Sequence, residues 1–454
     1  MLVIASDIHL SDETVGVLVS PKTFSLFASR LRELAYQASW RAGGHYEPVR
    51  EIDIILLGDI LDPLQSTRWL EHNPGEAGYV RPWHDPQSQV FIQKMREITR
   101  AIIEKNSGAM NVLQWFKSGE AICLPPADRN GKPAQYTLER VCPTIRLHYV
   151  VGNHDWFYHL PGPEYDSIRA EIIQAMGLSN LPGPFPHKPE TDAGLVEILG
   201  QYRLVARHGD QYDPMSFNPQ IGRNSASLAD IYSSEVIYRF PFEVARKLGD
   251  ELPERLVQGI QRMTNVRPLL ATPLWVIDQV SRHGTNQAQI GQLKSIWNGV
   301  IEEFLSLDIL RTDQFANPRL RNTLRMIFSF SQKTSLPTMA SMSRLLRNHI
   351  THEHISIARF AQQEAAIRAG QADFVVYGHT HSHEVVSLDK HIKDTNDTNQ
   401  IYINTGTWAT FFDYSRRYDP KQRTTPMHML TCVALYQDGE RLGRRYENWW
   451  ANFA

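Results

Sequence analysis

Short apolar runs recur along the chain, and most of them lead directly into glycine, aspartate or histidine. Each run has four to seven residues and is rich in valine, isoleucine and leucine, a pattern typical of buried strands rather than of helices. These runs lie at 2–6, 52–57, 145–151, 202–207, 373–377 and 401–404. A seventh run, 428–436, is followed by Asp438-Gly439 and another run at 441–447, an order that predicts a β-hairpin.

Helical periodicity fills several of the intervals between these runs. Apolar residues at positions 24, 27, 28, 31 and 35 share one helical face behind Pro21, and proline suits the first turn of a helix. Residues 357–368 carry a similar apolar face and end before Gly370, which suits a helix C-terminus. This alternation of strands and helices predicts a layered α/β fold.

Two long stretches interrupt the alternation. Residues 63–144 contain a helical pattern near 87–117, followed by a polar loop with several prolines. Residues 213–372 show helical periodicity and no strand pattern, with one apolar stripe formed by Ile290, Leu293, Trp297, Ile301 and Phe304. A stripe of this kind predicts a helix that packs into a core. We therefore expect a core built from 1–212 and 373–454, with a helix and loop insertion at about 63–144 and an all-helical cap at 213–372.

The composition narrows the class of protein. The 454 residues allow about three domains at roughly 150 residues each, or one sheet-based domain with long insertions. Hydrophobic residues make up 42% and charged residues 21% of the chain, which excludes a disordered chain, a collagen-like repeat and a small disulfide scaffold. The formal net charge is −2, so no global basic field indicates a nucleic-acid partner.

Cysteine usage and hydropathy predict a cytoplasmic protein. Cys123, Cys142 and Cys432 form no C-x-x-C pair and no recognisable disulfide framework, which is typical of a reducing compartment. No apolar run approaches the roughly 18–20 residues of a membrane span. The first apolar run meets a carboxylate at Asp7, too early for the apolar region of a signal peptide.

Polar residues follow five of the predicted strands at the point where each strand ends. They form the segments Asp7-Ile8-His9, Gly58-Asp59-Ile60-Leu61-Asp62, Gly152-Asn153-His154-Asp155, His208-Gly209-Asp210 and Gly378-His379-Thr380-His381. Residues two apart on an extended segment share a face, and ligands of open α/β sheets bind outside the carboxyl ends of the strands. Each of the first four segments alone is more often a turn or a cap, and Gly378-His379-Thr380-His381 is the least ordinary; five at successive strand ends predict a site.

The donor types indicate a metal centre. Nitrogen and oxygen donors without cysteine suit divalent first-row ions. Seven candidate ligands are too many for one tetrahedral ion and suit two ions that share a bridging carboxylate. The candidate metal ligands are Asp7, His9, Asp59, Asn153, His208, His379 and His381.

Together these segments resemble the calcineurin-like metallophosphoesterase superfamily, whose pattern is D-x-H, G-D-x-x-D, G-N-H-D/E, H-G and G-H-x-H. The resemblance covers roughly 1–62, 145–212 and 373–436 and implies two packed mixed β-sheets flanked by helices. It also implies two ions, of Mn, Fe or Zn, with Asp59 bridging them. One ion would take Asp7, His9, Asp59 and His381, and the other Asp59, Asn153, His208 and His379.

The activity that this resemblance implies is hydrolysis of a phosphate ester or pyrophosphate bond. A hydroxide that bridges the metals would attack phosphorus, because bound metals lower the pKa of water from about 15.7 towards 7. His154 matches the family residue that acts as general acid on the leaving oxygen, a role worth roughly 10²–10⁴-fold. Asp155 or Asp62 would orient histidines as neighbouring carboxylates. We therefore expect a phosphorylated small molecule or nucleotide as the substrate.

Two other enzymes and one binding role remain open. Ser6-Asp7-Ile8-His9-Leu10 and His208-Gly209-Asp210 look like UDP-2,3-diacylglucosamine pyrophosphatases, although that group typically has arginine where His154 stands and has a far shorter lid. A nuclease like the double-strand-break-repair exonucleases of the superfamily would also carry the G-N-H-D segment. A scaffold that uses the fold only for binding is the third alternative, and the presence of all seven candidate ligands argues against it.

The charge of the predicted cap bears on the substrate. Residues 213–372 hold 18 Lys and Arg against 14 Asp and Glu. Between Gln314 and His352 there are basic residues and no acidic ones. This basic stretch comprises Arg319, Arg321, Arg325, Lys333, Arg344 and Arg347. It is either a solvated helix face or a surface that binds the distal part of a phosphorylated substrate.

Overall fold

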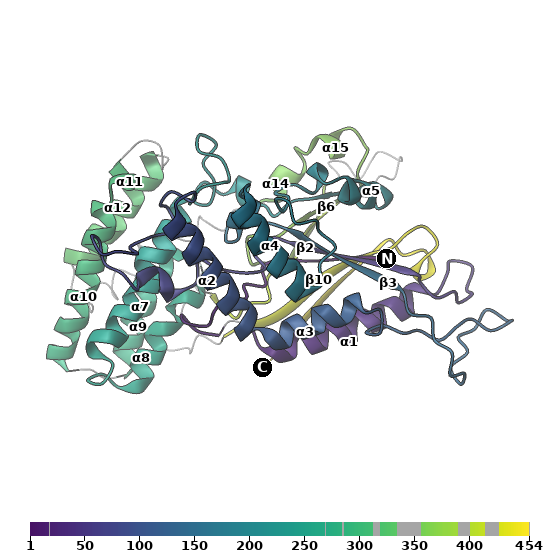
Figure 1. Ribbon diagram of the computed structural model, residues 1–454, viewed down its shortest axis with the longest axis horizontal. Helices are drawn as coiled ribbons and strands as arrows, with labels where there is room; N and C mark the ends of the chain where they lie inside the picture. Colours follow the sequence, from purple (N-terminus) through teal and green to yellow (C-terminus); the bar gives the residue numbers. More distant parts are fainter. Residues whose placement is uncertain are drawn as a thin grey trace.

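The computed structural model describes residues 1–17, 19–267, 269–283, 286–311, 318–333, 356–388, 400–413 and 426–453. Within them the chain forms two mixed β-sheets with helices around them (Figure 1). The first sheet has the order β11 (Tyr446–Phe453), β10 (His428–Leu435), β1 (Leu2–Ala5), β2 (Glu51–Leu57) and β3 (Thr144–Val150). The second sheet has the order β4 (Leu204–Ala206), β6 (Phe374–Tyr377), β8 (Ile401–Asn404) and β7 (Glu384–Ser387).

The alternating directions of the side chains along β1 explain how the two sheets pack. Leu2 and Ile4 lie in the core between the sheets, where they meet Leu204 and Val376 of the second sheet. The intervening Val3 points into the opposite core, beneath the helices. Successive side chains of a strand face opposite sides, so a continuous apolar run such as this one belongs to a strand that is buried on both faces.

Helices cover the outer faces of both sheets. The outer face of the first sheet is packed against α1 (Pro21–Ala38), α2 (Gln89–Lys105), α3 (Ser107–Lys117) and α4 (Pro163–Met176). The other surrounding helices of the core are α5 (Ala193–Gln201), α14 (Ala358–Ala361) and α15 (Ala365–Arg368). Apolar residues of α14 and α15 pack on the outer face of the second sheet. The layers are therefore helices, sheet, sheet and helices, as the sequence predicts for a layered α/β fold.

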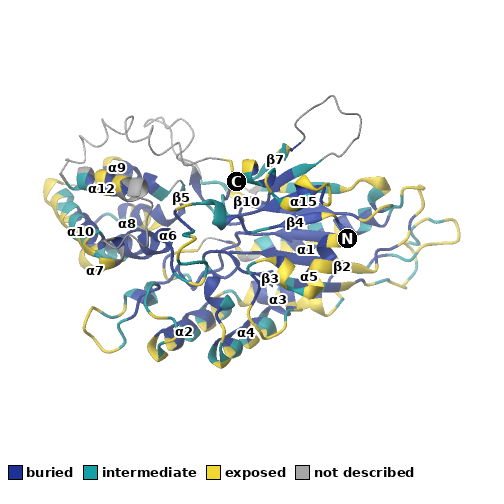
Figure 2. Ribbon diagram, turned by 90° about the horizontal axis from the view of Figure 1, so that it is seen from above, coloured by how far each residue is buried: buried dark blue, intermediate teal, exposed yellow. Residues whose placement is uncertain are grey.

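The large insertion has a hydrophobic core of its own and lies at one end of the sheets (Figure 2). Its helices are α6 (Leu228–Tyr232), α7 (Arg239–Leu248), α8 (Glu254–Gln261), α9 (Thr272–His283), α10 (Gln287–Ser306), α11 (Asp308–Arg311) and α12 (Pro318–Lys333), with a π-helical turn at Ser233–Tyr238. The apolar stripe predicted around Trp297 lies on α10, and Leu293, Trp297, Ile301 and Phe304 are buried in this core. Their role as core residues is confirmed.

One strand lies within the insertion, where the sequence shows no strand pattern. The two residues of β5 (Val266–Arg267) pair in parallel with β9 (Phe412–Asp413). A two-residue strand is too short to produce any periodicity, so its existence depends on the tertiary contact alone. Residues 356–372 also differ from the predicted cap, because their apolar side chains join the second sheet and not the insertion's core.

Three predicted elements have different boundaries. Residues 357–368 form two short helices because Glu364 leaves the helical conformation and accepts hydrogen bonds from Tyr212 and Tyr377, at 2.8 and 2.7 Å. The helix predicted near 87–117 is divided at Asn106. The hairpin exists, but its second strand begins at Tyr446, since the preceding loop first pairs with Trp40 and Ala42.

None of the apolar runs in the sequence predicts the strand β7. Its exposure alternates along Glu384–Ser387, so it contains no continuous apolar run of the kind that marks the other strands. Because the antiparallel pair β7 and β8 lies at one edge of the second sheet, β7 needs to be apolar on only one face.

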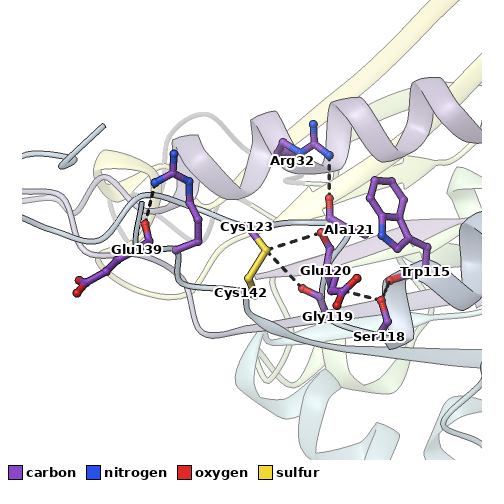
Figure 3. The surroundings of a disulfide bond; sticks show 10 residues. Arg32, Trp115, Ser118, Gly119, Glu120, Ala121, Cys123, Glu139 and Cys142 are labelled. Atoms are coloured by element: carbon purple, nitrogen blue, oxygen red, sulfur yellow. Dashed lines mark hydrogen bonds between the residues drawn. A yellow bond between two sulfur atoms is a disulfide. The ribbon is translucent and has the colours of Figure 1, made fainter. Parts of the chain in front are cut away.

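The structure joins Cys123 and Cys142 in a disulfide, which contradicts the absence of a pairing expected from the sequence (Figure 3). The two residues meet because the chain between them folds back, with a backbone bridge between Leu124 and Val141. Cys432 is a free, buried thiol. The argument from cysteine usage for a reducing compartment therefore loses its basis. Among the described ranges, no helix combines the length and apolar character needed to cross a bilayer.

Candidate metal centre

The ends of five strands meet at one place in the fold. The loops after β1, β2 and β3, which run in parallel, face the loops after β4 and β6, which also run in parallel. Backbone hydrogen bonds connect neighbouring loops, from the Asp7 amide to the Gly58 carbonyl at 3.0 Å and from the Gly378 amide to the His208 carbonyl at 2.8 Å. The structure thus brings all seven candidate ligands together, from segments far apart in the sequence.

Unusual backbone conformations are concentrated in these loops. The φ angles of Asp7, His9, Asp59, His379 and His381 lie between 52° and 68°. Side chains other than glycine rarely adopt this left-handed region, and each such residue costs roughly 1–3 kcal/mol. Five candidate ligands share this conformation, so the direction of their side chains towards one point lowers the stability of the fold.

The first group of donors contains Asp7, His9 and His381, whose ligand atoms all lie within 4.8 Å of one another. Nδ1 of His9 lies 2.9 Å from Oδ2 of Asp62. Because a carboxylate only accepts, Nδ1 carries the proton and Nε2 presents a lone pair. That nitrogen faces Nε2 of His381 at 3.0 Å, which in turn lies 3.4 Å from Oδ1 of Asp7. Nδ1 of His381 is buried and has no hydrogen-bond partner among the described residues.

The second group contains Asp59, Asn153, His208 and His379. Nδ1 of His208 donates to the carbonyl of Leu57 at 3.0 Å, so its Nε2 is the ring nitrogen left for the other donors. This nitrogen faces Oδ2 of Asp59 at 3.2 Å and Oδ1 of Asn153 at 3.1 Å. The same amide oxygen lies 2.9 Å from Nδ1 of His379.

His379 is held in a matching orientation by a carboxylate. Its Nε2 lies 3.1 Å from Oδ2 of Asp213, which accepts the proton and leaves Nδ1 unprotonated. This contact could not be predicted from the sequence, because Asp213 belongs to no motif. The only available signal is its position three residues after Asp210 in the same loop.

Without an ion, the contacts of 2.9–3.2 Å between these imidazole nitrogens and oxygens need a proton, and thus positive charge, between them. A divalent cation supplies that charge, and imidazole, carboxylate and amide donors suit Mn, Fe or Zn. Asp59 lies in a group with His208 and His379 and in another with His9 and His154, which is the position a bridging carboxylate needs. The donor set therefore fits the binding of a metal ion.

The pKa shifts of the same groups also indicate that the site needs positive charge. Burial alone would lower the pKa of His208, but Asp59 outweighs it and raises that pKa to about 10. Burial would likewise raise the pKa of Asp59, but His208 and His154 hold it well below its usual range. Without a cation, extra protons must neutralise the carboxylates. Metal binding replaces those protons.

Two glycines permit the close approach of the loops. A β-carbon on Gly58 would lie 2.9 Å from the α-carbon of Gly152 and would collide with the ring of His208. A β-carbon on Gly152 would collide with the carboxylate of Asp59. Glycine at these two positions of the G-D and G-N-H-D segments is therefore a packing requirement of the site.

His154 lies beside the donors and is oriented by Asp62. Its Nδ1 is 3.0 Å from Oδ2 of Asp62, and its backbone amide donates to Asp59 at 2.8 Å. Its side chain is 17% exposed, more than any of the candidate histidine ligands. Burial opposes protonation of His154, but Asp62 and Asp59 raise its pKa to about 10. Its Nε2 is thus available to a bound molecule.

The contacts of Asp155 differ from the contacts with histidine that were expected. Its carboxylate accepts hydrogen bonds from the Ile60 amide at 3.0 Å, the Tyr149 hydroxyl at 2.7 Å and the Gly152 amide at 2.5 Å. It contacts no histidine among the described residues. Of the two carboxylates considered for orienting histidines, Asp62 makes those contacts, and Asp155 holds the loops together.

The backbone of Asp7 is fixed by a segment that follows β8. The Thr407 hydroxyl donates to the carbonyl of Asp7 at 2.7 Å, and the Trp408 amide donates to it at 3.1 Å. Asp210, by contrast, forms an ion pair with Arg223 and belongs to none of the groups of donors. The third residue of the His-Gly-Asp segment is therefore structural.

Comparison with known proteins gave no match with any family model, curated protein or solved structure. The function of the protein is therefore inferred from the donor atoms of the site itself.

Proposed function

We propose that this protein is a hydrolase that uses two divalent metal ions to cleave a phosphate ester or phosphoanhydride bond. One observation carries the proposal: ring nitrogens of His208 and His379 converge on the oxygens of Asp59 and Asn153, in a centre that Asp59 links to a second group of donors. The two packed mixed sheets are also what the resemblance to the metallophosphoesterases implies.

When bound, the ions would polarise phosphoryl oxygens and make hydroxide available near neutral pH. One ion would be held by Asp7, His9, Asp59 and His381, and the other by Asp59, Asn153, His208 and His379. Histidines whose second nitrogen donates to a carboxylate or carbonyl keep a fixed tautomer, and the contacts of His9, His208 and His379 provide this.

His154 would donate a proton to the leaving oxygen. Its Nδ1 is engaged by Asp62, so Nε2 is the atom that can transfer the proton. The same carboxylate orients His9, and Asp62 therefore couples the position of the general acid to that of a metal ligand. A carboxylate behind the imidazole also stabilises its protonated form.

A metal-reconstituted substrate panel tests the activity. It would contain p-nitrophenyl phosphate, bis-p-nitrophenyl phosphate, a nucleotide-sugar pyrophosphate and single-stranded DNA. We expect hydrolysis of at least one of the first three, with loss of activity after chelation and recovery after metal is restored. Cleavage of DNA alone would indicate a nuclease. Metal uptake without any hydrolysis would contradict the enzyme and favour a scaffold.

Within the basic stretch considered for anion binding, Arg344 and Arg347 lie outside the described residues, as do the side chains of Arg319, Arg321 and Lys333. Arg325 is exposed on α12. The structure therefore offers no observation that favours a nucleic-acid substrate.

A further inference from the structure

A different arginine of the insertion lies close to the metal centre. Arg267 belongs to β5, which pairs with β9 so that Arg267 lies opposite Asp413. The chain reaches β9 directly from the segment whose Thr407 and Trp408 hold the carbonyl of Asp7. This short two-stranded sheet thus ties the insertion to the loop of a candidate metal ligand.

Packing keeps this connection in place. Phe412 of β9 is buried in the insertion's own core. Its ring lies over that of Trp275 on α9, with centroids 4.5 Å apart. Val266 of β5 is also fully buried in this core. Because both strands are anchored, the position of Arg267 relative to Asp7 is determined by the fold and not by a loose loop.

The guanidinium of Arg267 is only partly satisfied. Its Nη1 donates to the carbonyls of Thr264 and Val266, both at 3.0 Å. No carboxylate among the described side chains, which do not include that of Asp413, forms an ion pair with it. Other arginines of this region are paired: Arg81 lies 3.0 Å from Glu235, and Arg223 is paired with Asp210. A partly buried guanidinium without a counter-ion is costly, so this one is an exception that needs an explanation.

The charges that act on Arg267 support its position at the junction with the metal-centre loops. Burial lowers the pKa of its guanidinium, while the Tyr238 hydroxyl and the carboxylates of Asp62, Asp7 and Asp59 act against that. Arg267 also contributes, after burial, to the lowered pKa of His381. The guanidinium is therefore close enough to the donors to feel their charge, although it pairs with none of them.

With two ions in the centre, the carboxylates are neutralised and Arg267 faces positive charge. Cations gathered in a site of low dielectric attract an anion. A guanidinium beside them offers N–H donors in a planar fork, which matches phosphate oxygens better than an ammonium does. The arrangement is thus that of an anion receptor completed by the insertion.

We propose that Arg267 binds the non-bridging oxygens of the substrate's phosphoryl group, and that the substrate carries this group at the end of a small molecule. This inference rests on the proposed function. Enclosure supports a terminal phosphoryl group: the side chain of His379, the most exposed candidate ligand among the histidines, is only 11% exposed. Tyr238 and the buried Asp230 of the insertion lie near the same centre.

Binding of inorganic phosphate to the manganese-reconstituted protein, measured by calorimetry, tests this proposal. Arg267→Gln keeps an N–H that can reach the strand carbonyls, and Arg267→Lys keeps the charge without the fork. Arg262 is exposed in the 3₁₀ turn Arg262–Asn265 just before β5, so Arg262→Gln is the matched control. Metal content and thermal unfolding of each variant would show that the centre and fold are retained.

We expect Arg267→Gln to weaken phosphate binding by about 10–100-fold, as for loss of hydrogen bonds to a charged group. Arg267→Lys should recover part of that loss, and Arg262→Gln should bind like wild type. The catalytic efficiency for p-nitrophenyl phosphate should fall more than that for bis-p-nitrophenyl phosphate, because the diester has fewer free oxygens.

The outcomes separate this inference from the proposed function. If wild type hydrolyses esters and Arg267→Gln binds phosphate with unchanged affinity, the inference is overturned while the hydrolase stands. If phosphate binding depends on Arg267 but no ester is cleaved, the inference stands and the hydrolase does not. A wild-type protein that takes up metal and binds no phosphate would also overturn the inference, as would equal losses in Arg267→Gln and Arg262→Gln.

Discussion

The strand ends of the core and the insertion contribute to the same site in different ways. At the strand ends, five of the seven donors have a left-handed backbone conformation, and close-packed glycines precede Asp59 and Asn153. In the insertion, Arg267 lies in a two-residue strand whose position depends on Phe412, 145 residues further along the chain. A segment that needs a particular backbone conformation can be recognised from its residues. A contact made only by tertiary packing cannot be recognised in this way.

The largest expected effect follows a change at the shared carboxylate of the core. Asp59→Asn should abolish most activity and lower the affinity for both ions, because Asp59 lies in both groups of donors. The loss should exceed the roughly 10–100-fold that removal of an outer partner of a metal ligand costs. Steady-state kinetics at limiting manganese, with elemental analysis, would measure it.

Asp210→Asn is the matched control for that change. Asp210 is a buried aspartate of a neighbouring site segment, and it pairs with Arg223 and belongs to none of the groups of donors. Its variant should lose stability but retain both ions. Near-normal turnover by Asp59→Asn at limiting metal would contradict a bridging role.

His154→Ala should lower kcat by roughly 10²–10⁴-fold, as for loss of a general acid, and should leave the metal content unchanged. The ring of His187 lies 4.1 Å from that of His159 and contacts no candidate ligand, so His187→Ala controls for removal of a nearby imidazole. Comparing substrates with good and poor leaving groups would sharpen the test. An equal loss for both kinds of substrate would argue against proton donation.

A change at the junction with the insertion should separate phosphate binding from metal binding. Phe412→Ala removes a buried ring from the insertion's core and from β9, and should cost about 3–5 kcal/mol of stability. Phosphate affinity should fall because Arg267 loses its anchor, while metal content stays near wild type. Calorimetric titrations and denaturant unfolding would measure both.

The exposed Trp450 provides a control at which truncation should have little effect. If Phe412→Ala lost metal and phosphate binding to the same extent, the division between a metal-binding core and a phosphate-binding insertion would not hold.

The smallest effect on the site is expected from loss of the disulfide. Reduction of Cys123–Cys142, or its replacement by serines, should lower stability by no more than about 3 kcal/mol, in line with the size of the loop that it closes. Metal content should not change, because neither cysteine nor the loop between them supplies a donor. Unfolding curves with and without reductant would show the first effect, and a loss of metal on reduction would contradict the second.

Much of the fold could be predicted from the chain because its strands are buried on both faces. The continuous apolar runs at β1, β2 and β6 predict strands almost to the residue. The half-exposed β7 and the two-residue β5 have no such runs. Their existence depends on the neighbours that they pair with.

The same distinction applies to the site. All seven candidate ligands could be named from the sequence, because each follows a recognisable strand. Asp62 and Asp155 could not be distinguished, since both lie in the same kinds of segment and only the tertiary contacts assign the histidines to Asp62. Asp213 and Arg267 could not be found from sequence motifs, because their contacts are formed by distant parts of the chain.

The most direct test of the account is the metal stoichiometry of the wild-type protein, stripped with a chelator and then reconstituted with manganese. The two groups of donors that share Asp59 predict two ions per chain, both bound tightly enough to survive removal of free metal. A correctly folded protein that retains no ion under these conditions would contradict the metal centre and the hydrolase proposed from it.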